Sequence, residues 1–116
     1  MASRRSLERE DTRLRVMRLI AEDPKVSTRG IASALGISHG SAYYVLLALV
    51  EKGFVKLGNF ARNPKKGQYA YLITPSGIRE KAMLTRTFIV RRRAEYEEMK
   101  IEIEILEYEL KLGKDV

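Results

Sequence analysis

The first half of the chain carries apolar residues at the three- and four-residue spacing of helices, in three short stretches. The first stretch predicts an amphipathic helix that begins between Ser6 and Thr12 and ends near Glu22, because Asp23-Pro24 stops it. The residues expected on the buried sides of the three helices are Leu14, Met17, Ile20, Ala21, Ile31, Ala32, Leu35, Ala42, Val45, Leu46 and Leu49.

Serine and glycine residues mark the ends of the second and third helices. Ser27 is suited to cap a helix that runs through Leu35, and Gly36 suits the left-handed residue that ends it. Ser38 follows two residues later as the next cap, and the third helix ends near Lys52-Gly53. The second and third helices are therefore joined by a tight turn.

After the third helix the pattern changes to that of strands. Phe54–Leu57 and Tyr69–Ile73 are rich in β-branched and aromatic residues, which favour strands. Residues 58–68 between them have the Gly, Asn and Pro content of a long hairpin loop, with three positive charges at its tip. Thr74-Pro75 then supplies a cap followed by proline at the first helical position.

The segment from Ser76 to about Leu112 predicts one long helix, since it has no proline and no glycine after Gly77. Its length would be roughly 55 Å, too long for so small a domain to cover. A heptad seam with alternating spacings of four and three comprises Ile78, Ala82, Thr85, Ile89, Arg92, Tyr96, Met99, Ile103, Leu106 and Leu110. A second apolar stripe, expected beside this seam, comprises Ile101, Ile105, Tyr108 and Leu112.

Residues 101–105 also alternate in the way that a strand does. The helical interpretation is favoured because Glu, Leu and Lys dominate this region and because the seam continues on both sides of it.

Composition narrows the class of function. The chain has 22 Lys and Arg against 15 Asp and Glu, a net charge of +7, so nucleic acid is the first partner to expect and a membrane surface the second. With no cysteine and one histidine, His39, we expect no disulfide, no metal site and no cofactor. The longest apolar run, residues 42–50, is about half of what a bilayer requires, and the N-terminus lacks the apolar core of a signal peptide. We therefore expect a cytoplasmic protein with no membrane partner.

The charge is unevenly distributed along the chain. Residues 1–94 hold 19 basic and 7 acidic side chains, whereas residues 95–116 hold 3 and 8. The acidic end would be repelled by a polyanion, so we expect it to serve in self-association while the basic part meets the anion.

The order helix, helix, tight turn, helix, hairpin with a basic loop is typical of a winged helix-turn-helix. In that arrangement the third helix enters the DNA major groove, the second braces it, and the loop reaches an adjacent groove. The expected fold is therefore mainly α: a winged helix-turn-helix of three helices and a β-hairpin wing in residues 1–75, and a long C-terminal dimerisation helix in residues 76–116.

Three phrases carry a resemblance to a known family: Leu35-Gly36-Ile37-Ser38, Glu51-Lys52-Gly53-Phe54-Val55 and the run from Tyr69 to Ile78. Residues 27–75 resemble the winged-helix domain of the MarR family of bacterial transcriptional regulators. The second half is similar to the small MarR-type regulators associated with exopolysaccharide biosynthesis clusters, through Tyr43-Tyr44, Gly58-Asn59-Phe60 and the Glu-rich stretch from Glu95 to Glu109.

This resemblance covers about residues 12–110. It implies a non-enzymatic regulator that binds double-stranded DNA sequence-specifically as a homodimer and acts on exopolysaccharide genes. Many MarR relatives respond to small ligands, but the sequence names no effector, no operator and no sign of regulation.

The candidate DNA contacts lie on the second and third helices and on the wing. The residues expected at base edges are Ser38, His39, Gly40, Ser41, Tyr43 and Tyr44, and those expected at phosphates are Arg29, Arg62, Lys65 and Lys66. Leu47, Ala48 and Val50 stand where many relatives carry Arg or Lys, so bidentate reading of guanine is not available from this helix. Much of the affinity would then come from phosphates and DNA shape.

Each candidate also has a plainer interpretation. Tyr43 and Tyr44 could instead be core or dimer-contact aromatics, and His39 a merely exposed polar residue. The basic residues of the loop could serve only its solubility, and residues 91–93 are more typical of a solvated face than of a contact. The residues expected to carry dimerisation are Ile89, Tyr96, Met99, Ile103, Leu106 and Leu110.

Two other classes of function compete with a DNA-binding regulator. A winged helix can act as a protein-interaction module, here through Leu47, Val50 and the C-terminal stripe. An enzyme would need a nucleophile, a base or a metal cluster in a cleft, and the sequence contains no such set. The acidic residues at 95–109 are surface charges by their spacing.

Overall fold

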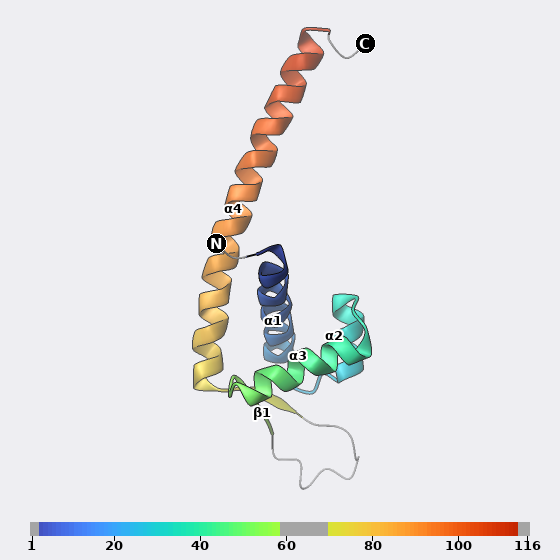
Figure 1. Cartoon of the computed structure of the whole chain (residues 1–116), viewed down its shortest axis with the longest axis vertical. Helices are drawn as coiled ribbons and strands as arrows, with labels where there is room; N and C mark the ends of the chain where they lie inside the picture. Colours follow the sequence, from blue (N-terminus) through green and yellow to red (C-terminus); the bar gives the residue numbers. More distant parts are fainter. Residues whose placement is uncertain (1–2, 59–69, 114–116) are drawn as a thin grey trace. The chain divides into compact units, whose positions relative to one another are not determined.

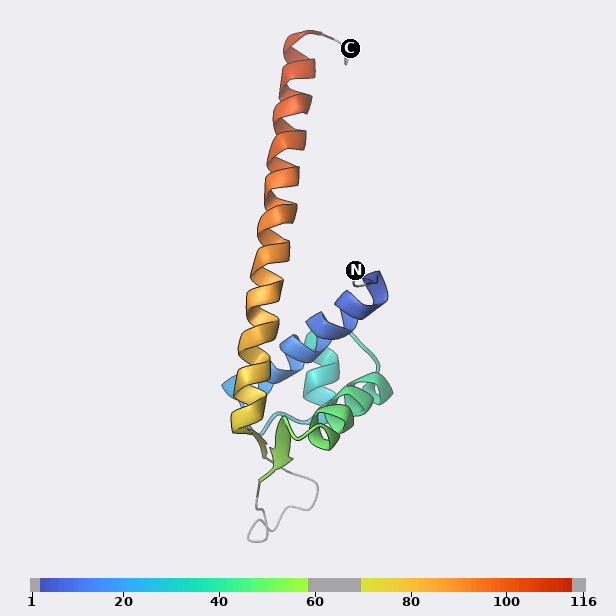
Figure 2. The same cartoon turned by 60° about the vertical axis from the view of Figure 1, so that its left-hand side comes forward.

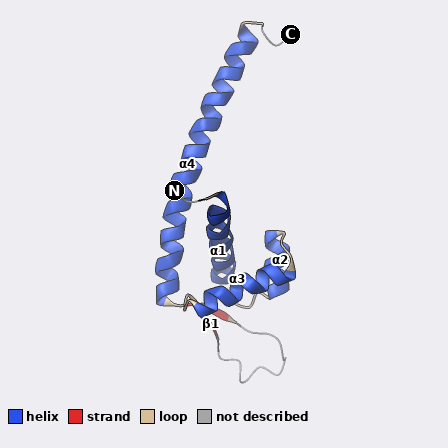
Figure 3. Ribbon diagram, viewed as in Figure 1, coloured by secondary structure: helices blue, strands red, loops and turns tan. Residues whose placement is uncertain are grey.

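The computed structural model describes residues 3–58 and 70–113. Within these residues the chain is mainly helical, and its one sheet is an antiparallel pair of short strands (Figure 1, Figure 3). The elements in chain order are α1 Arg4–Glu22, α2 Thr28–Leu35, α3 His39–Glu51, β1 Val55–Leu57, β2 Tyr71–Ile73 and α4 Pro75–Lys111. This order confirms the expected winged helix-turn-helix with a long C-terminal helix.

The chain divides into two compact units, one that ends at Thr85 and one that begins at Arg86. The first unit contains α1 to α3, the hairpin and the first turns of α4, and the second contains the rest of α4. The functional division placed at residues 75 and 76 stays a prediction.

Helix α1 begins earlier than expected. The Ser3 hydroxyl accepts a hydrogen bond from the Ser6 backbone N–H at 3.1 Å, so Ser3 is the N-cap and the helix starts at Arg4 rather than between Ser6 and Thr12. The end at Glu22 is confirmed, because Asp23 adopts an extended conformation with φ −141°.

The caps predicted for α2 and α3 are confirmed. The Ser27 hydroxyl accepts from the Gly30 N–H at 2.9 Å, and the Ser38 hydroxyl accepts from the Ser41 N–H at 3.1 Å. Gly36 ends α2 in the left-handed conformation, with φ 68°. These residues produce the sharp turn between α2 and α3, whose axes are bent by 113° (Figure 2).

The hydrophobic core lies in the first unit, and most of its members were expected. Its buried apolar residues are Leu14, Val16, Met17, Ile20, Ile31, Ala32, Ala42, Leu46, Leu49, Val55, Tyr71 and Leu84. Ala21 was expected to be buried and is exposed, while Val16 is fully buried. Leu35 and Val45 are only partly buried.

The hairpin is shorter than the sequence predicts. Val55 pairs with Ile73 and Leu57 with Tyr71, so Phe54 and Ala70 lie outside the strands. The N–H of Tyr71 donates to the carbonyl of Pro24 at 2.8 Å, which fixes the loop-side end of β2 to the segment after α1. The candidate phosphate contacts Arg62, Lys65 and Lys66 lie outside the described residues.

Helix α4 is one continuous helix, so the strand interpretation of residues 101–105 is wrong. The Thr74 hydroxyl caps it by accepting from the Gly77 N–H at 3.0 Å, and Pro75 occupies the first helical position, as predicted. A Cβ atom built on Gly77 would lie 2.0 Å from the carbonyl oxygen of Phe54. Gly77 therefore lets the first turn of α4 lie directly against the backbone of the chain leaving α3.

The second apolar stripe of α4 does not lie beside the heptad seam. Successive residues of an α-helix are turned by about 100°, so Ile101 and Ile105 each lie about 160° away from Ile103. The stripe is therefore on the side of the helix opposite to the seam, and the expectation that the two are adjacent is wrong.

Candidate nucleic-acid interface

The outer side of α3 gathers the residues predicted at base edges. Ala42, Leu46 and Leu49 recur at helical spacing and are buried against the rest of the first unit. The positions between them are consequently turned outward. The exposed residues at the start of this helix are Ser38, His39, Gly40, Ser41, Tyr43 and Tyr44.

The two tyrosines are surface residues of the chain. Tyr43 is 55% exposed and Tyr44 is 74% exposed, so neither is a core aromatic. Each presents a ring and a hydroxyl outward, which are the groups that can contact a thymine methyl and a base-edge donor or acceptor.

The serine hydroxyls at the start of α3 are not equivalent. Besides capping the helix, the Ser38 hydroxyl donates to the Ser41 Oγ at 2.8 Å. Its proton is thus used within the turn, whereas the Ser41 hydroxyl accepts that bond and keeps its own proton. Ser41 is the better placed of the two to donate to a bound molecule.

Gly40 has no packing reason to be glycine. A Cβ atom built there meets nothing within 4 Å, and the residue is exposed. A side chain at this position would extend into the space outside the chain and would not pack against another residue. Without a side chain here, the backbone of α3 can approach a bound molecule closely at Gly40.

Lysine and arginine are absent from α3 itself, whose residues are all described. The helix carries Glu51 at its end and Leu47, 41% exposed, on its outer side. Arg29, on α2, is exposed, and its side chain makes no hydrogen bond or ion pair with the described residues. It is the one predicted phosphate contact that the structure describes.

A junction missed by the sequence reasoning fixes the end of α3. Gly53, with φ 78°, follows the helix in the left-handed conformation, and its carbonyl accepts hydrogen bonds from the hydroxyls of Thr74, at 2.5 Å, and Ser76, at 3.0 Å. The N–H of Thr74 donates to the Phe54 carbonyl at 3.0 Å. The end of α3, the hairpin and the start of α4 therefore meet at one point. The signal in the sequence was the Thr-Pro-Ser-Gly run at residues 74–77. The helix cap accounts for Thr74 and Pro75 in this run, but not for Ser76 and Gly77.

An ion pair adds to this arrangement. Arg13 of α1 lies 3.7 Å from Glu80 in the first turns of α4, and both side chains are mostly buried. The Nε of Arg13 is buried and has no hydrogen-bond partner. The ion pair therefore holds the two side chains together but leaves one N–H of the guanidinium without a hydrogen bond.

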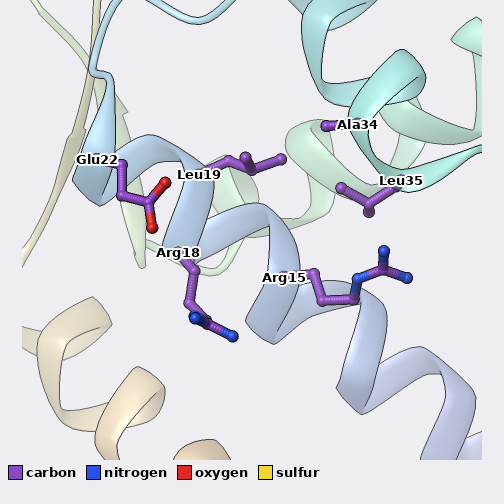
Figure 4. A pocket seen from close by; sticks show the side chains of 6 residues that line it. All are labelled: Arg15, Arg18, Leu19, Glu22, Ala34 and Leu35. Atoms are coloured by element: carbon purple, nitrogen blue, oxygen red, sulfur yellow. The ribbon is translucent and has the colours of Figure 1, made fainter.

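A hollow of about 170 Å³ lies between α1 and α2, away from the outer side of α3 (Figure 4). Its lining residues are Arg15, Arg18, Leu19, Glu22, Ala34 and Leu35. Two guanidinium groups, one carboxylate and apolar side chains give it a mixed character.

Other kinds of site are not formed by the described residues. Over residues 3–58 and 70–113, no three His, Cys, Asp or Glu side chains come close enough together to hold a metal ion. In the same ranges no single helix has the length and apolarity to cross a membrane; α2 and α3 meet those criteria only as a bent pair.

Comparisons with known proteins agree with this geometry. Residues 9–56 match the family described as winged helix-turn-helix DNA-binding. No curated protein matches the chain.

Solved structures of bacterial regulators share its fold. The MarR/EmrR family transcriptional regulator from Acinetobacter sp. ADP1 is 20% identical with a TM-score of 0.63, over 90% of this chain and 75% of that one. The PcaV transcriptional regulator from Streptomyces coelicolor is 14% identical with a TM-score of 0.63, over 90% and 79%. The S. aureus MepR–DNA complex is 20% identical with a TM-score of 0.59, over 89% and 76%.

Proposed function

We propose that the chain is a MarR-type transcriptional regulator that binds double-stranded DNA sequence-specifically. The observation that carries the proposal is the exposed start of α3, where polar and aromatic side chains outside the core share one outer surface. The match of residues 9–56 to a DNA-binding winged-helix family supports it, as does the shared fold with MepR, which was solved with DNA.

The start of α3 would enter the major groove and read base edges. Ser41 would donate from its hydroxyl, Tyr43 and Tyr44 would contact bases or thymine methyls, and Gly40 would let the backbone approach. Because α3 has no Arg or Lys, phosphate contacts and DNA shape would supply much of the affinity. Those phosphate contacts would come from Arg29 and from the wing residues Arg62, Lys65 and Lys66.

The acting form would be a homodimer joined through α4. Its seam residues in the second unit are all exposed in the single chain, which leaves a continuous apolar surface to cover. The proposed contact residues are Ile89, Tyr96, Met99, Ile103, Leu106 and Leu110. Two copies at a fixed separation would select paired half-sites about one helical turn of DNA apart, or a multiple of it.

The resemblance to regulators associated with exopolysaccharide clusters extends the proposal to those genes, in the cytoplasm. Sequencing the genomic DNA that copurifies with the cross-linked protein tests this directly. Enrichment of promoters upstream of polysaccharide genes is the expected result, and enrichment elsewhere would remove that part of the proposal.

The test of DNA binding is fluorescence anisotropy on two duplexes across a salt series. One duplex carries the intergenic DNA upstream of the protein's own operon, and the other is a scramble of the same composition. We expect about a hundredfold preference for the first, on the order of 3 kcal/mol, and a steep loss of affinity with salt. Arg29→Gln should lower the salt slope by about one, whereas Arg86→Gln, which removes the same charge from α4, should not.

The second candidate is a protein-interaction module, favoured by the exposure of Leu47 on a helix without basic residues. It predicts no binding to either duplex at low salt. Equal, salt-sensitive binding to both duplexes would instead indicate a reader of DNA shape.

A further inference from the structure

The C-terminal part of α4, from Tyr96 on, is apolar on two opposite sides. One side is the seam, here Tyr96, Met99, Ile103, Leu106 and Leu110. The other side, which we call the outer face, comprises Ile101, Ile105 and Tyr108, together with Leu112 directly after the end of the helix. The side chains of the outer face are 51–63% exposed, as fully as those of the seam.

A dimer joined through the seam leaves the outer face uncovered. In a two-stranded coiled coil the positions opposite the seam point to solvent and are normally polar. Here they hold isoleucine, tyrosine and leucine, and a contiguous exposed apolar surface of this kind marks an interaction site.

The charges beside the seam suit a second copy. Arg93 and Lys100, followed one heptad later by Glu107, lie along one edge of the seam, and Glu95 and Glu102 lie along the other. Over residues 93–102 the two edges have opposite signs and can face each other when two copies pack in parallel, so this part of the seam is complementary to itself.

The charges beside the outer face are different. Glu97 and Glu104 lie along one edge, with Lys111 one heptad after Glu104 at the end of the helix, and Glu98 and Glu109 lie along the other. These four glutamates have no ion pair with the described residues. Between residues 96 and 111, Lys111 is the one basic residue on these edges, and it lies at the end of the helix, whereas Lys100 lies nearer the seam.

We propose that the outer face docks a basic amphipathic helix of another protein. That helix would present apolar residues at the spacing i, i+4, i+7 to the outer face and Lys or Arg to the glutamates on both edges. A second copy suits it poorly, because copies meeting through this face would set glutamates against glutamates. This proposal depends on the proposed dimer in one respect: the dimer assigns the seam to a second copy and leaves the outer face for another partner.

A defined peptide tests the proposal without an identified partner. The probe is a labelled synthetic Leu/Lys peptide with helical amphipathic order, titrated against the full chain by fluorescence anisotropy. Its controls are a peptide of the same composition in scrambled order and the equivalent Leu/Glu peptide. We expect the chain to bind the ordered Leu/Lys peptide at least about tenfold more tightly than either control.

Variants of the chain identify the face that binds. Ile101→Gln with Ile105→Gln should weaken binding of the peptide about tenfold or more, because both apolar contacts are lost. Glu97→Gln with Glu104→Gln should weaken it several-fold at low salt. The matched control, Glu95→Gln with Glu107→Gln, removes the same charge beside the seam and should leave binding unchanged. Circular dichroism checks that each variant keeps its helix.

Three results would overturn the proposal: equal binding of the scrambled peptide, no binding, or a wild-type tetramer that becomes a dimer when Ile101 and Ile105 are replaced. The tetramer would assign the outer face to a second copy. A monomeric wild type in sedimentation would refute the proposed dimer alone, since the peptide titration still reports on the outer face.

Discussion

At the scale of single residues, Gly77 and Gly40 have opposite surroundings. Substituting each of them therefore distinguishes a role in packing from a role in binding. A Cβ atom on Gly77 would lie 2.0 Å from the Phe54 carbonyl oxygen, whereas one on Gly40 meets nothing within 4 Å. Gly77→Ala should therefore destabilise the protein by about 1–3 kcal/mol through overpacking. Gly40→Ala should leave stability unchanged or raise it by up to about 1 kcal/mol, because alanine favours the helix.

Urea unfolding followed by circular dichroism measures both changes. Gly40→Ala is also expected to weaken DNA binding if the backbone approaches DNA there. A stable Gly40→Ala variant with wild-type affinity would show that glycine is not needed at the proposed interface.

Tyr44 provides the corresponding test of a side chain. It is 74% exposed, so Tyr44→Ala should change the free energy of unfolding by no more than about 0.5 kcal/mol. Loss of a base contact should cost about 1–3 kcal/mol of binding, roughly tenfold or more in Kd. Anisotropy titrations on the native duplex measure the loss, and an unchanged Kd would place Tyr44 outside the interface.

At the scale of elements, the residues that begin and end helices α2 and α3 were the part of the fold most predictable from the sequence. Ser27, Gly36 and Ser38 act through bonds to their own neighbours, so local sequence was sufficient to place α2 and α3. The start of α1 is also set by a local cap, at Ser3, so the later start expected for this helix missed a local signal. The burial of Val16 in place of Ala21 depends instead on packing against other elements. The junction at Gly53 joins residues more than twenty positions apart and leaves no local periodic signal.

Ser38 tests the contribution of one cap to one element. Its hydroxyl both accepts from the Ser41 N–H and donates to the Ser41 side chain. Ser38→Ala should destabilise the protein by about 1 kcal/mol through loss of the cap. Ser41→Ala keeps the cap and should cost less in chemical denaturation. Equal losses in the two variants would contradict the assignment of Ser38 as the cap.

At the scale of the whole molecule, the two units differ in how much of their apolar surface they bury themselves. The first unit, up to Thr85, has its own core and needs no partner to bury it. The second unit, from Arg86 on, is helix with exposed apolar faces and almost no buried side chains of its own. The proposed ligand surface is therefore on the first unit, at the start of α3, and the proposed protein contacts are on the exposed apolar faces of α4.

The proposed dimer can be tested by charging its seam. Ile103→Lys with Leu106→Lys places two cations in the apolar contact and should yield a monomer in analytical ultracentrifugation. The monomer should bind the paired-site duplex more weakly, because one half-site then has to supply all of the affinity. Ile103→Gln with Leu106→Gln is the control for added charge: it should also weaken the dimer but leave non-specific binding to scrambled DNA unchanged. A dimer that survives the lysine pair would show that the seam is not the contact, and a monomer with full affinity would show that dimerisation does not serve DNA binding.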